Sequence, residues 1–229
     1  MEPPAYWLPR PSSETLEHEA LFERLHAQYV APQQADWLDE PLPVPKWVFL
    51  CWLAEHKGYL LHGSDNADIL EFEPRTPKDD SPDDFSKQTA VFATNDGIWP
   101  IFYAVLNRKQ FKLRTLNGAL QFAAPLGGWS DMRYFFSLTE SVLKQRPWHD
   151  GTVYILPRDG FQQGPPPYKL RGHLVLEPHW GNPKTVRPAA KLRVTPEDFP
   201  FLGQVRGHDD ITVMAAAARD PYGYPWLDE

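Results

Sequence analysis

Proline and glycine constrain the fold of this chain more than any other feature of its sequence. The 229 residues include 25 prolines and 14 glycines, and these are spread along the whole length. Proline fixes φ and removes a backbone donor, and glycine tolerates the φ values that tight turns need. The sequence therefore predicts many short elements joined by long loops, not a few long helices.

Length and charge bound the possible functions. A chain of 229 residues can bury a substantial core, and we expect one compact domain. Its hydrophobic fraction of 42% and charged fraction of 23% are ordinary for a globular protein. The net charge of −7 opposes a general role in binding nucleic acid, although a local basic groove stays open.

The single cysteine and the apolar runs bear on location. Cys51 lies in an apolar run, so we expect it in the core, without a disulfide framework or a thiolate metal cage. No run approaches the roughly 20 apolar residues that a membrane-spanning helix needs. The start of the chain, Met1 to Pro4, lacks the basic residues of a secretory signal. We therefore expect a cytoplasmic protein without a membrane partner.

Residues 1–57 are expected to form an N-terminal arm and two helices packed on the core. The arm is proline-rich up to about Pro11, and residues 31–45 form a second proline-rich loop. Ser12 or Ser13 is expected to cap a helix that runs through Tyr29. Its apolar stripe would consist of Leu21, Phe22, Leu25 and Tyr29.

The second helix is expected to start beside Pro45 and to stop at Gly58, which would form its C-terminal cap. This segment is apolar nearly all round, so we expect it to be buried.

Residues 58–229 are expected to form a β-rich domain. Pro74 to Lys87 is an acidic loop of the length that lids and mobile connections often have. Asn95 or Asp96 can cap a helix with Pro100 in its first turn, and Thr195 can cap a short helix that starts at Pro196. Strands are expected at residues 59–62, 90–94, 132–138, 152–157, 172–176, 190–194 and 211–215.

A β-hairpin is predicted at Asn117-Gly118. The segments 111–116 and 119–122 flank this dipeptide, and Asn-Gly is typical of a two-residue turn. Two helices followed by strands and one later helix indicate an α+β fold with a split or curved antiparallel sheet. The sequence contains neither type of Gly-rich phosphate loop, so a nucleotide would have to bind in some other way.

Several other residue groups are candidates for chemical sites. His173 and His179 are six apart, which is not a helical metal-ligand spacing, and no Gly-x-Ser-x-Gly elbow supports a serine triad. The pairs Asp79-Asp80 and Asp83-Asp84 are interpreted as a solvated loop. His208-Asp209-Asp210 is interpreted as a structural turn, with a functional cluster as the alternative.

The run Leu60-Leu61-His62-Gly63-Ser64 reads as a buried strand that ends in an imidazole, a glycine and a hydroxyl. Taken alone, it fits a strand that simply ends in a turn, and it also fits a site where a flat ligand approaches the backbone.

The order of motifs along the chain supports the second interpretation, a ligand site. The His62-Gly63-Ser64 strand is followed by the strand Ala90–Thr94 and by a helix that carries Tyr103. Over roughly 45 residues this arrangement resembles the first two motif blocks of the ADP-ribosyltransferase superfamily, in the branch that contains poly(ADP-ribose) polymerases and diphtheria toxin. The resemblance implies a split antiparallel sheet and NAD as the substrate.

By this resemblance, His62 would bind the ribose next to nicotinamide and Gly63 would offer its backbone to the carboxamide. Ser64 would assist at the ribose, and Tyr103 would stack on the nicotinamide. Phe92 stands where the family usually has tyrosine, so a ring wall is kept and a hydroxyl is lost.

The family also has an acidic residue that stabilises the positive charge formed as nicotinamide leaves. The matching segment is Leu176 to Trp180, where either Glu177 is the acid or His179 holds the position and the acid is missing.

Two functions follow from the resemblance. The first is an ADP-ribosyltransferase that passes ADP-ribose from NAD to an unknown acceptor, whether protein, nucleic acid or small molecule. The second is an inactive member of the same fold that acts as a binding or interaction module. A third reading, transfer of a 2′-phosphate from RNA to NAD, would need a set of arginines, and Arg75, Arg108 and Arg114 follow no clear pattern.

Overall fold

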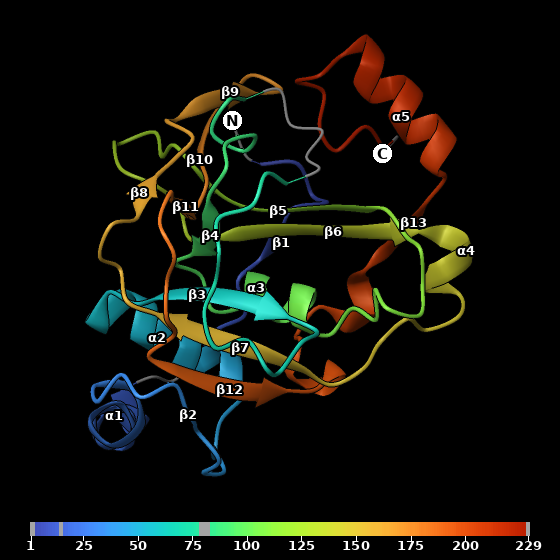
Figure 1. Ribbon diagram of the computed structural model, residues 1–229. Coiled ribbons are helices and arrows are strands. Elements are labelled where there is room, and N and C mark those ends of the chain that lie inside the picture. The colour runs from blue at the N-terminus through green and yellow to red at the C-terminus, as the bar shows by residue number, and fades with distance from the viewer. Residues whose placement is uncertain (1–2, 14–15, 78–82, 228–229) are drawn as a thin grey trace.

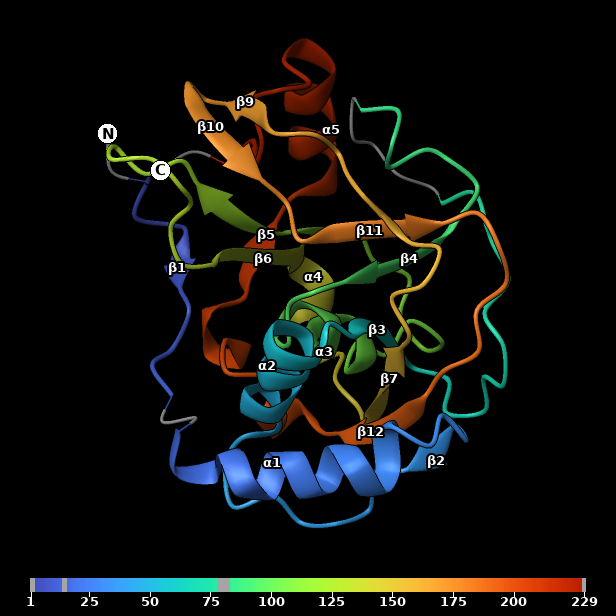
Figure 2. The same ribbon diagram turned by 90° about the vertical axis from the view of Figure 1, so that its left-hand side faces the viewer.

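The computed structural model describes residues 3–13, 16–77 and 83–227. It is a mixed α+β structure built mainly from two sheets, which confirms the predicted class (Figure 1). Helices α1 and α5 lie at opposite ends of the molecule (Figure 2). Among the described residues, no helix is long and apolar enough to cross a membrane.

The first sheet holds the predicted His62 strand near its centre. Its neighbouring strands are antiparallel, except that the short strand β2 runs parallel to β12. In spatial order its strands are β2 (Asp36–Trp37), β12 (Ala190–Val194), β7 (Gly151–Leu156), β3 (Leu60–Ser64), β4 (Val91–Thr94), β11 (His179–Asn182) and β8 (Gln162–Gln163).

The second sheet lies beside the first. In spatial order it contains β1 (Leu8–Pro9), β6 (Arg133–Thr139), β5 (Thr115–Phe122), β10 (His173–Leu176) and β9 (Tyr168–Leu170). β13 (Arg206–His208) pairs with β6 in parallel.

The helices are short, as the proline content predicts. The α-helices are α1 (Glu19–Leu25), α2 (Lys46–Lys57), α3 (Trp99–Ala104), α4 (Glu140–Leu143) and α5 (Asp210–Arg219). Three 3-10 turns are η1 (Leu16–His18), η3 (Pro196–Asp198) and η4 (Leu202–Gln204), and the π-helical turn η2 (His26–Val30) extends α1.

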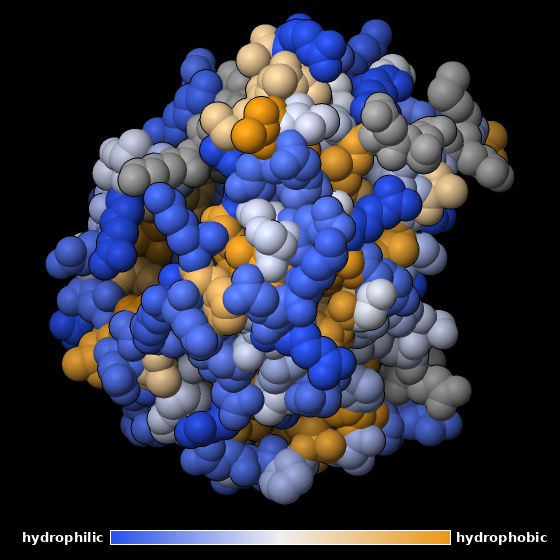
Figure 3. All heavy atoms as spheres, turned by 90° about the vertical axis from the view of Figure 1, so that its right-hand side faces the viewer, coloured by the Kyte–Doolittle hydropathy of each residue, from blue (hydrophilic) through white to orange (hydrophobic). Residues whose placement is uncertain are grey.

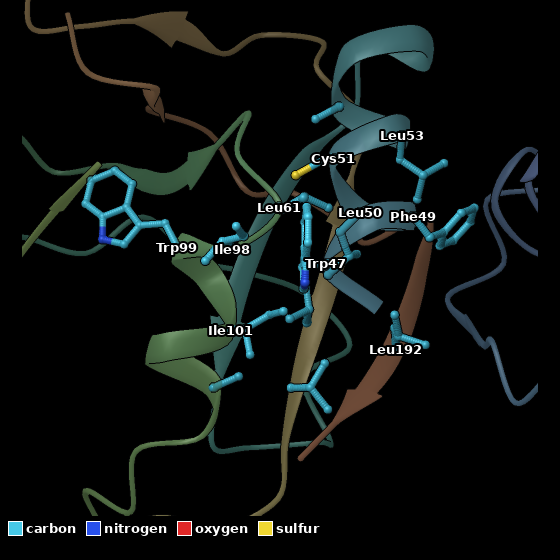
Figure 4. Packing of buried hydrophobic residues seen from close by; sticks show 14 of the residues in the cluster. Trp47, Phe49, Leu50, Cys51, Leu53, Leu61, Ile98, Trp99, Ile101 and Leu192 are labelled. Atoms are coloured by element: carbon cyan, nitrogen blue, oxygen red, sulfur yellow. The ribbon is translucent and has the colours of Figure 1, made fainter. Parts of the chain in front are cut away.

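Helix α2 forms the centre of the largest hydrophobic core. It is buried on nearly all sides, and Gly58 ends it in the left-handed conformation at φ 73°, both as predicted. Ile98 and Ile101 of the α3 region point toward Trp47 and Leu61 (Figure 4). Cys51 is buried in the same core.

The opposite face of the first sheet carries a second, smaller core, which includes Leu60, Val91, Tyr154 and Trp180. Side chains alternate along strands, so consecutive residues such as Leu60 and Leu61 fall into different cores.

Two glycines allow α3 to lie directly on the first sheet. A Cβ at Gly63 of β3 would fall 1.7 Å from the carbonyl oxygen of Pro100, and one at Gly151 of β7 would fall 2.0 Å from that of Ala104. Backbone atoms at such distances cannot move aside independently of the helix. The position of α3 therefore depends on the absence of side chains at Gly63 and Gly151.

The predicted hairpin at Asn117-Gly118 is wrong. Both residues lie inside the continuous strand β5, and neither has the positive φ that this turn requires. The turn that joins β5 to β6 instead contains Gly127 and Gly128, at φ 92° and 80°. Asn117 uses its side chain for a tertiary contact, because its Oδ1 accepts a hydrogen bond from Nε1 of Trp99.

Two further predictions need correction. The strand expected at 211–215 is part of helix α5, because Asp209 caps the backbone N–H of Thr212 and an alanine-rich run follows. The first helical segment starts at Leu16, later than caps at Ser12 or Ser13 would place it, and residues 14–15 lie outside the described residues. Its predicted stripe is confirmed for Phe22 and Leu25, which are fully buried.

We predict that Gly151→Ala destabilises the protein by about 3 kcal/mol, because the added methyl group overlaps the Ala104 carbonyl. Gly118→Ala is the matched control, since its Cβ would lie 3.5 Å from Trp7, an ordinary contact. The control should change the free energy of unfolding by less than about 1 kcal/mol. Urea denaturation measures both values, and equal effects would contradict the role given to Gly151.

Candidate functional site

A large cavity lies between the two sheets and has a volume of about 1630 Å³. The space-filling view shows a hollow with hydrophobic residues in its depth and hydrophilic residues around it (Figure 3). Ser64, predicted to assist at the ribose, is not among the lining residues. The other predicted site residues all line the cavity: His62, Gly63, Phe92, Tyr103, Glu177 and His179.

His62 stands where β3 and β4 separate. These two strands pair only at Leu61 and Thr94, whereas β3 and β7 pair along five residues. Nδ1 of His62 lies 2.7 Å from the backbone oxygen of Phe92, so the imidazole bridges the gap between the strands. Burial lowers the pKa of His62, and the Phe92 carbonyl opposes this. Because a carbonyl only accepts, Nδ1 carries the proton and Nε2 of the neutral ring is an acceptor.

Helix α3 occupies the side-chain position of Gly63. The carbonyl of Pro100 lies where a Cβ would be, so a flat ligand cannot approach the backbone from that side. A glycine after a strand histidine indicated that another group lies close to the backbone here. That group is helix α3. The contact of the Gly63 backbone with a carboxamide stays a prediction.

His179 is surrounded by aromatic rings. Its ring centroid lies 4.9 Å from that of Phe92, 5.4 Å from that of Phe85 and 5.7 Å from that of Trp99. Burial lowers the pKa of His179 to about 4, and the negative charge of Asp83 only partly opposes this. At neutral pH, His179 is therefore an uncharged member of an aromatic wall.

One polar atom of His179 is buried without a partner. Among the described residues, Nδ1 accepts and donates no hydrogen bond, and the Oε2 atom of Glu177 lies 3.9 Å away. Such an atom costs free energy unless a ligand or a small movement supplies a partner. The two side chains proposed for the third motif position therefore lie next to each other on the cavity wall.

Glu177 is held by a neighbouring tyrosine. The hydroxyl of Tyr168 donates a hydrogen bond to its Oε1, and the side chain of Glu177 is 19% exposed. Burial and the nearby carboxylate raise the pKa of Tyr168, so its hydroxyl remains a donor. This contact fixes one carboxylate oxygen and leaves Oε2 on the side of His179.

Helix α3 supplies two aromatic residues to the cavity. Trp99 belongs to the core cluster, but its ring points away from Ile98 and Ile101 (Figure 4), and both Trp99 and Tyr103 line the cavity. The guanidinium of Arg108 lies 4.9 Å from the Tyr103 ring, in cation–π geometry.

Asp96, one of the two residues predicted as a cap, holds the turn that leads into α3, although the N-cap position itself is Ile98. Oδ1 of Asp96 accepts hydrogen bonds from the backbone N–H groups of Ile98 and Trp99, and its Oδ2 accepts one from the Tyr134 hydroxyl at 2.6 Å. Burial raises the pKa of Asp96, while the charge of Arg10 and these hydrogen bonds lower it.

Several residues of the cavity were missed by sequence reasoning. Phe85 and Asp83 lie in the segment interpreted as a solvated loop, yet both line the cavity. Asp84 lines it too, whereas Asp79 and Asp80 lie outside the described residues. The sequence feature that could have indicated this is an aromatic residue, Phe85, directly after two acidic residues, which is unusual for a fully solvated loop.

The remaining candidate groups lie only partly on the cavity, and of His208-Asp209-Asp210 only Asp210 is among its lining residues. His208 is buried and its Nδ1 lies 2.6 Å from Oγ of Ser137, while Asp209 caps α5, which fits the structural turn favoured from the sequence. Arg108 and Arg114 line the cavity, but Arg75 does not. Within the described ranges, no three His, Cys, Asp or Glu side chains are grouped as a metal site.

No family model, curated protein or solved structure matches this chain. The cavity combines a neutral histidine wall, two aromatic residues from α3 and a carboxylate held by a tyrosine.

We predict that His179 titrates near pH 4 in the folded protein, because burial disfavours its charged form. The unfolded chain takes up this proton near pH 6.5, so folding loses stability as the pH falls below that value. Between pH 7 and pH 5 the loss should be about 2 kcal/mol, and His179→Phe should remove it. NMR titration of the imidazole and urea unfolding at both pH values measure these effects, and titration near pH 6.5 would contradict the burial argument.

Proposed function

We propose that this protein binds NAD in the cavity between its two sheets and transfers ADP-ribose to an acceptor. The observation that carries the proposal is the convergence of motif residues that are far apart in the sequence. His62 of β3, Tyr103 of α3 and the Glu177/His179 pair beside β11 line the same cavity. Their order along the chain does not by itself require these residues to meet.

The lining of the cavity suits the parts of a dinucleotide. Tyr103, Trp99 and Phe92 offer aromatic walls for the nicotinamide ring. Nε2 of His62 can accept a hydrogen bond from a ribose hydroxyl. Arg108 and Arg114 place positive charge on the cavity for the pyrophosphate. The volume of about 1630 Å³ exceeds the roughly 300–1,000 Å³ common for small-molecule sites.

The sheet geometry supports the same proposal. The single pairing of β3 and β4, at Leu61 and Thr94, separates the strands next to His62. This agrees with the split antiparallel sheet that the resemblance to ADP-ribosyltransferases implies. We propose the ADP-ribosyltransferase-like fold on this ground, together with the position of β11 alongside β4.

The proposed reaction breaks the glycosidic bond between C1′ of the ribose and the nicotinamide nitrogen. Nicotinamide leaves with the bonding electron pair, and an acceptor nucleophile forms the new bond to C1′ and releases its proton to the solvent. Glu177 would stabilise the positive charge on the ribose, because a carboxylate favours a charge that exists mainly in the transition state. Its hydrogen bond from Tyr168 would hold one oxygen in place.

A second candidate is a binding module without catalysis. Phe92 lacks the hydroxyl of the usual tyrosine, and His179, which is neutral, takes the first position of β11. If His179 rather than Glu177 faces the ribose, the site would bind NAD without the charge that cleavage needs.

Calorimetry with NAD tests NAD binding, which both candidate functions require. His62→Ala should weaken NAD binding by at least tenfold, a loss of about 1.4 kcal/mol, because the ribose loses its acceptor. His56→Ala is the control, since His56 lies on α2 and does not line the cavity. Equal affinity for wild type and His62→Ala would remove the proposal.

Nicotinamide release separates the two candidates. We predict that the wild-type protein releases labelled nicotinamide from NAD and that Glu177→Gln lowers the rate by at least 100-fold while NAD still binds. His179→Phe should retain most of the rate, because the imidazole is neutral in this account. Binding without release by the wild type would instead select the inactive module.

A further inference from the structure

A second buried polar atom beside the cavity has no hydrogen-bond partner among the described residues. It is the hydroxyl oxygen of Tyr224. Tyr224 follows helix α5 in the chain and lines the cavity together with Trp226. A buried hydroxyl without a partner costs free energy, and a ligand that supplies the partner recovers that cost.

Aromatic neighbours hold the ring of Tyr224 in place. Its centroid lies 5.3 Å from that of Trp226 and 5.9 Å from that of Phe135, both in edge-on geometry. The ring of Trp7 lies 6.1 Å away, and both Trp7 and Phe135 are buried. The hydroxyl is therefore positioned by ring packing and not by a hydrogen bond of its own. A donor fixed in this way is preorganised for a ligand.

The cavity reaches the face of β5 on which this hydroxyl lies. A Cβ on Gly118 would fall 3.6 Å from the hydroxyl oxygen of Tyr224, so the hydroxyl lies on the Gly118 face of the strand. Asn117 and Gly118 direct their side-chain positions to opposite faces, yet both line the cavity. Within the described part of the chain, β10 pairs with β5 only at Gln121 and Phe122, which leaves the edge at Gly118 without a second strand.

Tyr224 lies near the carboxylate of the proposed reaction. Glu177 follows the last residue of β10, accepts a hydrogen bond from Tyr168 and lines the same cavity. Burial, followed by the nearby Tyr103 and Glu177, raises the pKa of Tyr224 well above its ordinary value. The hydroxyl therefore keeps its proton at neutral pH and is able to donate a hydrogen bond.

We propose that Tyr224 is a specificity residue of the NAD site, a role that rests on the proposed function. Its hydroxyl donates a hydrogen bond to one of the two hydroxyls on the ribose next to nicotinamide. Glu177 is proposed to act at C1′ of this ribose, so a donor near Glu177 faces the same sugar. His62 accepts from the other hydroxyl, on the side of the first sheet. A site that hydrogen-bonds a substrate hydroxyl rejects analogues without it, so the cavity selects ribose over deoxyribose here.

Calorimetry with NAD and two deoxy analogues tests this contact. The analogues lack either the 2′- or the 3′-hydroxyl of the ribose next to nicotinamide. Tyr224→Phe removes only the phenolic hydroxyl and should weaken NAD binding at least tenfold. One of the two analogues should bind wild type and Tyr224→Phe within threefold of each other, because it lacks the hydroxyl that Tyr224 contacts. The same loss of affinity for all three ligands would overturn the proposal.

Stability separates a ligand contact from a structural one. Because the hydroxyl has no partner among the described residues, Tyr224→Phe should leave the urea midpoint of the free protein unchanged or raise it. Tyr6→Phe is the matched control, since Tyr6 packs on Trp7 and Phe135 but does not line the cavity, and it should bind NAD within threefold of wild type.

Two outcomes would overturn the role of Tyr224 alone: a lower urea midpoint for Tyr224→Phe, or NAD affinity equal to that of wild type. Absence of NAD binding by the wild-type protein would contradict the proposed function, and the role of Tyr224 with it.

Discussion

The contact of helix α3 with two glycines positions the rest of the site. Because Gly63 and Gly151 lack side chains, the carbonyls of Pro100 and Ala104 lie directly on β3 and β7. The helix is only six residues long, so it cannot hold this position by its own hydrogen bonds. Asp96 fixes its start and the hydrophobic core fixes its inner face, which leaves Trp99 and Tyr103 on the cavity.

Helix α3 also contacts the second sheet. Trp99 donates its indole N–H to Asn117 of β5, so α3 connects the first sheet to the second across the cavity. The aromatic wall around His179 combines Phe92 of the first sheet, Trp99 of α3 and Phe85 of the loop before β4. The cavity is therefore lined by both sheets and by α3.

The sequence predicted those elements in which local preference and tertiary packing agree. Gly58 ends α2 and Thr195 begins η3 because cap residues act within one turn. Asn117-Gly118 failed as a turn because its tertiary contacts outweighed a local preference. The segment 211–215 failed because its apolar residues also suit a helix, and the Asp209 cap decides between the two. Phe85 could not be assigned to the site, since its contact with His179 joins residues almost a hundred positions apart.

The proposed binding of NAD requires its nicotinamide end to lie against the aromatic wall. The most direct measurement is a crystal structure of the full chain with a non-hydrolysable NAD analogue. We predict a nicotinamide ring beside Tyr103 and Trp99, with a ribose hydroxyl within hydrogen-bond distance of Nε2 of His62. An analogue bound outside the cavity, or a cavity that stays without ligand at saturating concentration, would contradict the account.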